Sequence, residues 1–132
     1  ILLKPGRLSQ SEYEEMMHHV EDGTSILDKA PSLRKYIPAT RHHHERQDGK
    51  GYPDGLSGAN IPLFASIIAV ADTFDAMTSN RPYRKAFSEE EALQELVRVA
   101  GTQLRADLVD VFVGLLDERS AGHLPVAFAR AV

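Results

Sequence analysis

The sequence predicts an all-α fold for a single domain of 132 residues. Two segments place a serine three residues before a glutamate, Ser9 with Glu12 and Ser88 with Glu91, which is the pattern of a helix capping box. A third segment, after Pro62, repeats apolar residues at steps of three and four, as an amphipathic helix does. Signals for β-strands are weak along the whole chain.

The first half of the chain is expected to form several short helices. The first covers residues 9–22, and Gly23 is expected to interrupt or end it. A second helical stretch covers residues 25–29. Pro31 suits the start of a further helix, in which Pro38 favours a kink or a break.

The second half is expected to begin with a loop and continue with longer helices. Residues 45–60 read ERQDGKGYPDGLSGAN, and their four glycines and one proline predict a long loop. Pro62 suits the first turn of the next helix, and the helix that begins at Ser88 is expected to end near Gly101. The apolar face predicted for the helix after Pro62 consists of Leu63, Ile67, Val70, Phe74 and Met77. The last helix carries Leu108, Val109, Phe112, Leu115 and Leu116.

Composition narrows the classes of function. The chain has no cysteine, which excludes disulfides and thiolate metal sites and fits a cytoplasmic location. A formal net charge of −4 argues against binding a nucleic-acid duplex. The longest apolar stretch, Ile61 to Ala71, is too short to span a membrane. The chain begins with Ile1 rather than methionine and shows no signal peptide, so residues upstream are expected to be missing.

Five of the six histidines fall before residue 45, and they admit two interpretations. They form either a solvated polar patch or a metal site. Imidazole together with carboxylate suits iron, manganese, zinc, nickel or cobalt. Adjacent histidines on a helix point about 100° apart, so they would reach two neighbouring ions, and such a pair of ions is suited to phosphoryl chemistry. These five are His18, His19, His42, His43 and His44.

Charged residues around position 80 also have two interpretations. Asp72 and Asp75 lie three residues apart and share a helix face, where they are either exposed or paired with a metal, a histidine or a basic side chain. Arg81, Arg84 and Lys85 follow directly. These cations either hold a phosphate or stabilise the C-terminus of the preceding helix.

The segment HHERQDGKGYPDGL, residues 43–56, resembles the signature of HD-GYP domains. The resemblance continues through residues 61–86, 101–104 and 108–112, and it covers residues 1–116 in all. It implies a helical bundle of the HD superfamily, with an HD-GYP domain at residues 1–118 and a tail at 119–132. It also implies a centre of two or three divalent metal ions, iron or manganese above all, and hydrolysis of cyclic di-GMP to pGpG or GMP.

The resemblance assigns roles to individual residues by position. The implied metal ligands are His19, His43, His44 and Asp72. The implied substrate-binding residues are Tyr52, Asp75, Arg81 and Arg84.

The sequence also departs from the family pattern. The His-Asp doublet that names the family would precede Ile1, so we expect an N-terminally truncated domain that lacks the catalytic doublet and is itself inactive. Gln47 replaces the usual tryptophan and Ser66 the usual arginine, and Leu104-Arg105-Ala106 replaces Phe-Asp-Pro. An apolar groove left by the absent helix would favour a homodimer.

Two alternative functions stay open at this point. One is a non-catalytic module that senses cyclic di-GMP or docks a protein partner through the GYP loop. The other is hydrolysis of a different nucleotide. An intact doublet upstream would favour the enzyme over the sensor.

Overall fold

The described elements of the protein are helical, which confirms the predicted all-α class. The computed structural model describes residues 4, 6, 8–80 and 85–120 of the chain. Beyond the helices, these residues contain only an isolated bridge between Ala100 and Leu104. The α-helices are α1 (Gln10–Met17), α2 (His19–Asp28), α3 (Ile37–His42), α4 (Leu63–Thr78), α5 (Glu89–Val99) and α6 (Ala106–Ser120), and the 3-10 helices are η1 (Pro31–Tyr36) and η2 (Gly58–Asn60).

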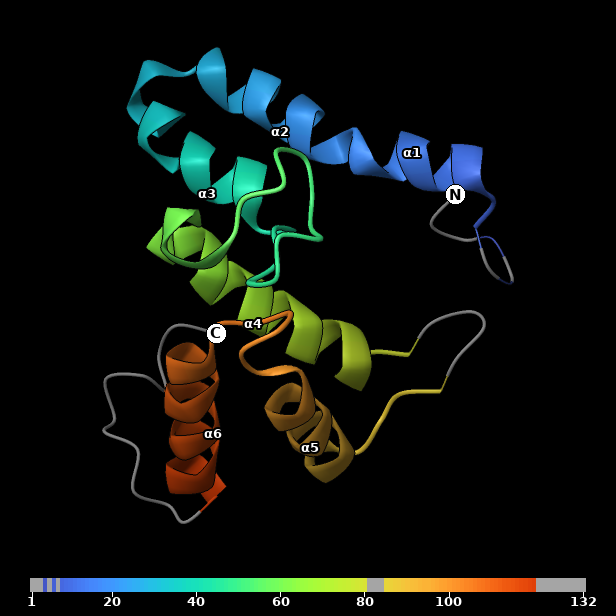
Figure 1. Cartoon of the computed structure of the whole chain (residues 1–132), viewed down its shortest axis with the longest axis vertical. Helices are drawn as coiled ribbons and strands as arrows, with labels where there is room; N and C mark the ends of the chain where they lie inside the picture. Colours follow the sequence, from blue (N-terminus) through green and yellow to red (C-terminus); the bar gives the residue numbers. More distant parts are fainter. Residues whose placement is uncertain (1–3, 5, 7, 81–84, 121–132) are drawn as a thin grey trace.

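Helix α4 joins two regions of the molecule. Figure 1 shows α1 and α2 following one another along the top, α3 returning beneath α2, and α5 and α6 at the bottom. Helix α4 crosses the middle and packs against α3 on one side and against α5 and α6 on the other. We call residues 8–60 the N-terminal region, and residues 61–80 with 85–120 the C-terminal region.

Both predicted capping boxes are present. The Ser9 hydroxyl accepts from the Glu12 N–H at 3.3 Å, and the Glu12 carboxylate accepts from the Ser9 N–H at 2.7 Å. Ser88 and Glu91 make the same pair of bonds at 3.2 and 2.7 Å. Each box satisfies backbone donors that a helix N-terminus would otherwise leave unpaired, so these two helix starts follow from local sequence.

The helix break predicted at Gly23 is wrong. The chain turns instead at His18, and α2 continues through Gly23 to Asp28. A Cβ atom at position 23 would lie 3.1 Å from the Thr40 Cγ2 atom, which is tighter than usual van der Waals contact. The glycine therefore serves close packing between α2 and α3, which sequence spacing alone does not reveal.

Pro31 and Pro38 both lie at the start of a helix, but the details differ from the prediction. Pro31 opens a 3-10 helix rather than an α-helix, and the change to α-helix falls between Tyr36 and Ile37. Pro38 lies in the first turn of α3, where its missing N–H costs no hydrogen bond. The predicted break therefore lies just before Pro38.

The hydrophobic core lies in the C-terminal region. The predicted apolar face of α4 is correct for Val70 and Met77, which are buried, but wrong for Leu63 and Ile67, which are 50% and 43% exposed. Ala65 and Ser66 are the buried residues in the first turns of α4. Helix α3 packs against α4, and Figure 1 shows it beside this end of the helix. The core cluster consists of Val70, Met77, Ala92, Leu96, Val99, Leu104 and Val109.

Helix α6 carries the apolar residues predicted for the last helix and continues through Ser120, past the domain boundary expected after residue 118. The remaining residues of the predicted tail, 121–132, lie outside the described part of the chain. None of the described helices is long and apolar enough to cross a membrane.

Candidate metal centre

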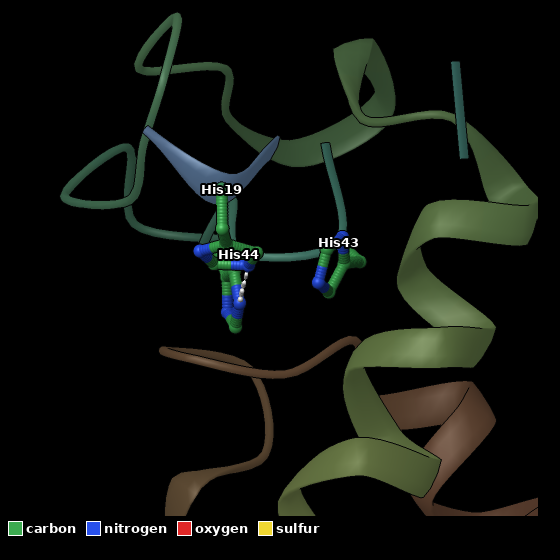
Figure 2. Close-up of side chains that lie close together, drawn as sticks. All are labelled: His19, His43 and His44. Atoms are coloured by element: carbon green, nitrogen blue, oxygen red, sulfur yellow. Dashed lines mark hydrogen bonds between the residues drawn. The ribbon is translucent and has the colours of Figure 1, made fainter. Parts of the chain in front are cut away.

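Three histidines from two separate segments meet at one point. His19 opens α2, and His43 and His44 directly follow α3, which packs against α2. Figure 2 shows the three rings side by side. One nitrogen atom from each ring lies within 4.8 Å of the other two. That spacing is compatible with shared coordination of a metal ion.

Hydrogen bonds to backbone carbonyls set the tautomers of His19 and His43. The Nδ1 atom of His19 faces the Met16 carbonyl, and the Nδ1 atom of His43 lies 2.7 Å from the Thr40 carbonyl. A carbonyl oxygen only accepts, so each Nδ1 must carry the proton and donate it. Each Nε2 atom therefore keeps a lone pair. Metal-binding histidines usually donate their second ring nitrogen in this way.

His44 is held in its neutral form. Its Nε2 atom lies 3.2 Å from the Nε2 atom of His19 and donates to the lone pair there (Figure 2). Burial above all, together with the charges of His43 and His19, lowers the pKa of His44 to about 4. A neutral imidazole is the form that binds a metal ion, and His44 would bind through Nε2 after its single proton moves to Nδ1.

The two other histidines of the N-terminal region are directed elsewhere. His18 is exposed and its Nδ1 atom lies 3.1 Å from a carboxylate oxygen of Glu21. Both ring nitrogens of His42 face oxygen acceptors at 2.9 Å, the Pro38 carbonyl and the Asp54 carboxylate. Neither histidine therefore directs a lone pair to the cluster.

A cleft of about 300 Å³ opens beside the histidines. Its lining includes His43, His44 and, from α4, Asp72. Asp72 is not part of the tight group of three imidazoles, but its charge acts on His44 and opposes the lowering of that pKa. The cleft thus combines neutral imidazole with carboxylate, a ligand set that suits divalent transition metals.

Two tyrosines form an aromatic wall of this cleft. The ring of Tyr52 stacks on His44 with centroids 4.9 Å apart, and Tyr13 meets Tyr52 edge to face at 6.3 Å. Burial above all, together with the nearby Tyr13 and Asp72, raises the pKa of Tyr52 to about 12. The Tyr52 hydroxyl therefore stays protonated and can donate a hydrogen bond into the cleft.

Glu45 holds the loop that carries Tyr52, a role that the sequence analysis missed. Its side chain is buried, with 4% of the residue exposed, and accepts from the N–H groups of Asp54 at 2.7 Å and Leu56 at 2.9 Å. Gly51 passes so close to the chain that a Cβ there would lie 2.5 Å from the Arg46 nitrogen. The position of Glu45 directly after the paired histidines was the available signal for its importance.

Arg46 joins this loop to the C-terminal region. Its guanidinium makes two bonds to Asp48, at 3.0 and 2.8 Å, and one to the side-chain oxygen of Gln103 at 3.0 Å. The N–H of Gln47 donates to the Gln103 carbonyl, and the N–H of Asp48 donates to the Thr102 carbonyl. The cleft therefore lies where the two regions meet.

The other substrate-binding residues implied by the family resemblance are Asp75, which does not line the cleft, and two arginines, which lie outside the described residues. Asp75 is exposed and accepts from the Ser79 hydroxyl at 3.4 Å. Arg81 and Arg84 lie outside the described residues. Conversely, Lys50 and Gln103 line the cleft although the sequence analysis assigned them no role.

A family model described as HD domain matches residues 1–108 of the chain. The chain belongs to the HD domain family. The resemblance to HD-GYP domains is confirmed by similar proteins that are named cyclic di-GMP phosphodiesterases. A cyclic di-GMP phosphodiesterase of Thermotoga maritima is 42% identical over 120 residues, covering 89% of this chain and 33% of the relative. The cyclic di-GMP phosphodiesterase response regulator RpfG of Xanthomonas campestris is 42% identical over 115 residues, covering 86% and 30%.

Other similar proteins are named for a different substrate, cyclic GMP-AMP. The 3'3'-cGAMP-specific phosphodiesterase 2 of Vibrio cholerae is 38% identical over 122 residues, covering 89% of this chain and 23% of the relative. A crystal structure of the cyclic GMP-AMP specific phosphodiesterase V-cGAP3 of V. cholerae matches with a TM-score of 0.68 and 23% identity, covering 83% of this chain and 25% of that one. This structure supports the HD-domain fold. The chain spans about a third or less of the length of these relatives.

Proposed function

We propose that this HD domain provides the metal-binding centre of a phosphodiesterase that hydrolyses cyclic di-GMP to pGpG or GMP. The observation that carries the proposal is the convergence of His19, His43 and His44 beside a cleft that also contains Asp72. Packing of an apolar core does not require three imidazoles and one carboxylate to lie close together. A metal site is the simplest function that uses all of them.

In this proposal His19, His43, His44 and Asp72 hold two or three divalent ions, iron or manganese in the first place and zinc, nickel or cobalt as further candidates. Bound ions of this kind lower the pKa of coordinated water and neutralise charge on a phosphate. The carbonyls of Met16 and Thr40 keep the first two histidines in the ligating tautomer. Burial keeps His44 unprotonated at neutral pH.

The substrate would be bound by the walls of the cleft. The protonated Tyr52 hydroxyl can donate to a phosphate oxygen, and the ring can stack with a base. Among the described cleft residues, Lys50 is a cation whose ammonium makes no ion pair, whereas Arg46 is paired with Asp48. Lys50 is therefore available to attract phosphate, together with Arg81 and Arg84, which keep that proposed role.

The substrate class is supported by the names of the relatives. Two relatives at 42% identity are named for cyclic di-GMP, and others for 3'3'-cGAMP, which is also a cyclic dinucleotide. Three imidazoles and one carboxylate are fewer ligands than two ions with four or more ligands each require. We therefore expect the 132-residue chain by itself to bind metal and cyclic di-GMP with little or no turnover.

The test is calorimetric titration of the chain with MnCl₂ and then with cyclic di-GMP, followed by a hydrolysis assay. Binding of cyclic di-GMP is expected to depend on manganese and to be lost, with the metal, in the double variant His43→Ala and His44→Ala. The matched control is His18→Ala, which removes an exposed histidine outside the cluster. Cyclic di-GMP binding that persists without metal and in the double variant would contradict the proposal and favour a non-catalytic sensing module.

A further inference from the structure

Gln103 lines the cleft and is held by hydrogen bonds to both its backbone and its side chain. It lies in the short turn between α5 and α6, where its N–H donates to the Val99 carbonyl at 3.0 Å. Its own carbonyl accepts from the N–H of Gln47 at 3.2 Å. Both backbone groups are therefore engaged, one within the C-terminal region and one with the loop of the N-terminal region.

The orientation of the Gln103 side chain follows from its partner. The side-chain oxygen accepts from the Arg46 guanidinium at 3.0 Å, and Arg46 is itself fixed by two bonds to Asp48. A guanidinium has donors only, so the amide oxygen of Gln103 must face it. The opposite end of the amide is then the NH₂ group, which makes no hydrogen bond within the described residues.

Gln103 belongs to the part of the cleft lining that comes from the C-terminal region, whereas His43 and His44 come from the N-terminal region. Gln103 lines the same cleft as His43, His44 and Asp72. In the view of Figure 2 the brown segment after α5 runs below the ends of His19 and His44. Since the histidines and Gln103 line one cleft, a ligand whose phosphate lies at the histidines can extend another part toward Gln103. In a nucleotide that part is the sugar and base.

A fixed amide donor distinguishes between purine bases. The outer edge of guanine presents two acceptors, N7 and O6, whereas adenine presents the N7 acceptor and an N6 amino donor. The amide NH₂ of Gln103 can donate to the guanine O6 atom and would face the amino donor of adenine at the same position, whereas N7 accepts in both bases and does not discriminate. Because its position is set by three hydrogen bonds, little ordering is needed when a base binds.

We infer that Gln103 is a specificity residue that reads a guanine base of a cyclic dinucleotide, with its amide NH₂ donating to the O6 and N7 edge. This inference rests on the proposed function and refines it by naming the part of the substrate that is recognised. The competing explanation is that Gln103 only ties the loop of residues 45–60 to the turn after α5. The two roles use opposite ends of the same amide.

The substitution Gln103→Glu separates the two roles. A glutamate keeps the oxygen that accepts from Arg46, so the tie to the loop is retained, but it replaces the donor by an acceptor. The matched control is Gln94→Glu, the same change at an exposed position of α5. Binding of cyclic di-GMP, cyclic di-AMP and bis(p-nitrophenyl) phosphate is measured by calorimetry with MnCl₂ present. The melting temperature of each variant is recorded beside it.

Gln103→Glu is expected to reduce the preference for cyclic di-GMP over cyclic di-AMP by about tenfold, the effect of one lost hydrogen bond together with one new acceptor for the adenine amino group. Binding of bis(p-nitrophenyl) phosphate, which has no base, is expected to be unchanged, and Gln94→Glu is expected to change nothing. An unchanged preference, or an equal loss for all three ligands, would overturn the inference.

A second measurement needs no variant. Cyclic di-IMP keeps N7 and O6 and lacks only the 2-amino group of guanine, so it is expected to bind the unmodified chain within about threefold of cyclic di-GMP. Binding as weak as that of cyclic di-AMP would overturn the inference while leaving the proposed function in place. Failure of the unmodified chain to bind any of the dinucleotides would reject both.

Discussion

The two regions of this HD domain are held together by different forces. In the C-terminal region, apolar side chains of α4, α5 and α6 form one cluster, and Leu96 has no exposed surface. In the N-terminal region the buried apolar residues are Val20 and Ala39, and Ile26 is 67% exposed. There the loop of residues 45–60 is held by the side chains of its own first two residues: Glu45 accepts from backbone N–H groups later in the loop, and Arg46 donates to Gln103.

This difference suits the chemistry that each region supports. Each candidate ligand needs a partner for one ring nitrogen and a free lone pair on the other. Backbone carbonyls are these partners for His19 and His43, a role that apolar packing cannot fill. The C-terminal region provides a rigid support and contributes Asp72 and Gln103 to the cleft. Stability and site geometry can therefore be perturbed separately.

The largest effect is expected from a cavity in the core. Leu96→Ala should lower the free energy of unfolding by about 3 kcal/mol, because it removes buried methyl groups and leaves a cavity in a packed cluster. Ile26→Ala, in the exposed part of α2, should change it by less than about 0.5 kcal/mol. Urea denaturation monitored by circular dichroism measures both. Equal losses in the two variants would contradict the contrast between the regions.

A smaller effect is expected from the polar anchor of the loop. Glu45→Gln leaves one of the N–H groups of Asp54 and Leu56 facing an amide NH₂, which should cost about 2 kcal/mol. Hydrogen exchange of these two amides should accelerate, while exchange in α5 stays slow. Glu118→Gln, an exposed change on α6, serves as the control. Accelerated exchange throughout α5 would show that the two regions unfold together.

The smallest effect is expected from acid. Hydrogen bonds from Arg46 lower the pKa of Asp48 from its ordinary 3.8 to about 2. The contribution of Asp48 to stability is therefore complete above the ordinary pKa and is lost as the pH falls toward about 2. The carboxylate is solvated, so the loss should be modest. Unfolding free energies measured across this range should fall less steeply for Asp48→Asn than for the unmodified chain, and parallel curves would exclude this contribution.

Features that depend on neighbouring residues in the chain were predictable. The capping boxes at Ser9 and Ser88 and the proline at the start of α4 involve groups within one helical turn. The helix break at Gly23 was predicted wrongly, because the residue that explains this glycine is Thr40, on another helix. The exposure of Leu63 and Ile67 has the same origin, since periodicity does not tell which face of α4 meets α3.

By itself, the sequence determined the all-α class, the starts of two helices and the residue types suited to a metal centre, because these depend on local hydrogen bonding and on side-chain chemistry. The family resemblance implied three of the five histidines as ligands, but local sequence gives no reason for that choice, and only the tertiary structure shows the contacts that bring them together. His42 is directed to Asp54, twelve positions later, whereas His44 meets His19, twenty-five positions earlier. The packing of α2 against α3 makes this selection, since side chains distant in sequence come within bonding distance only when the helices that carry them are in contact.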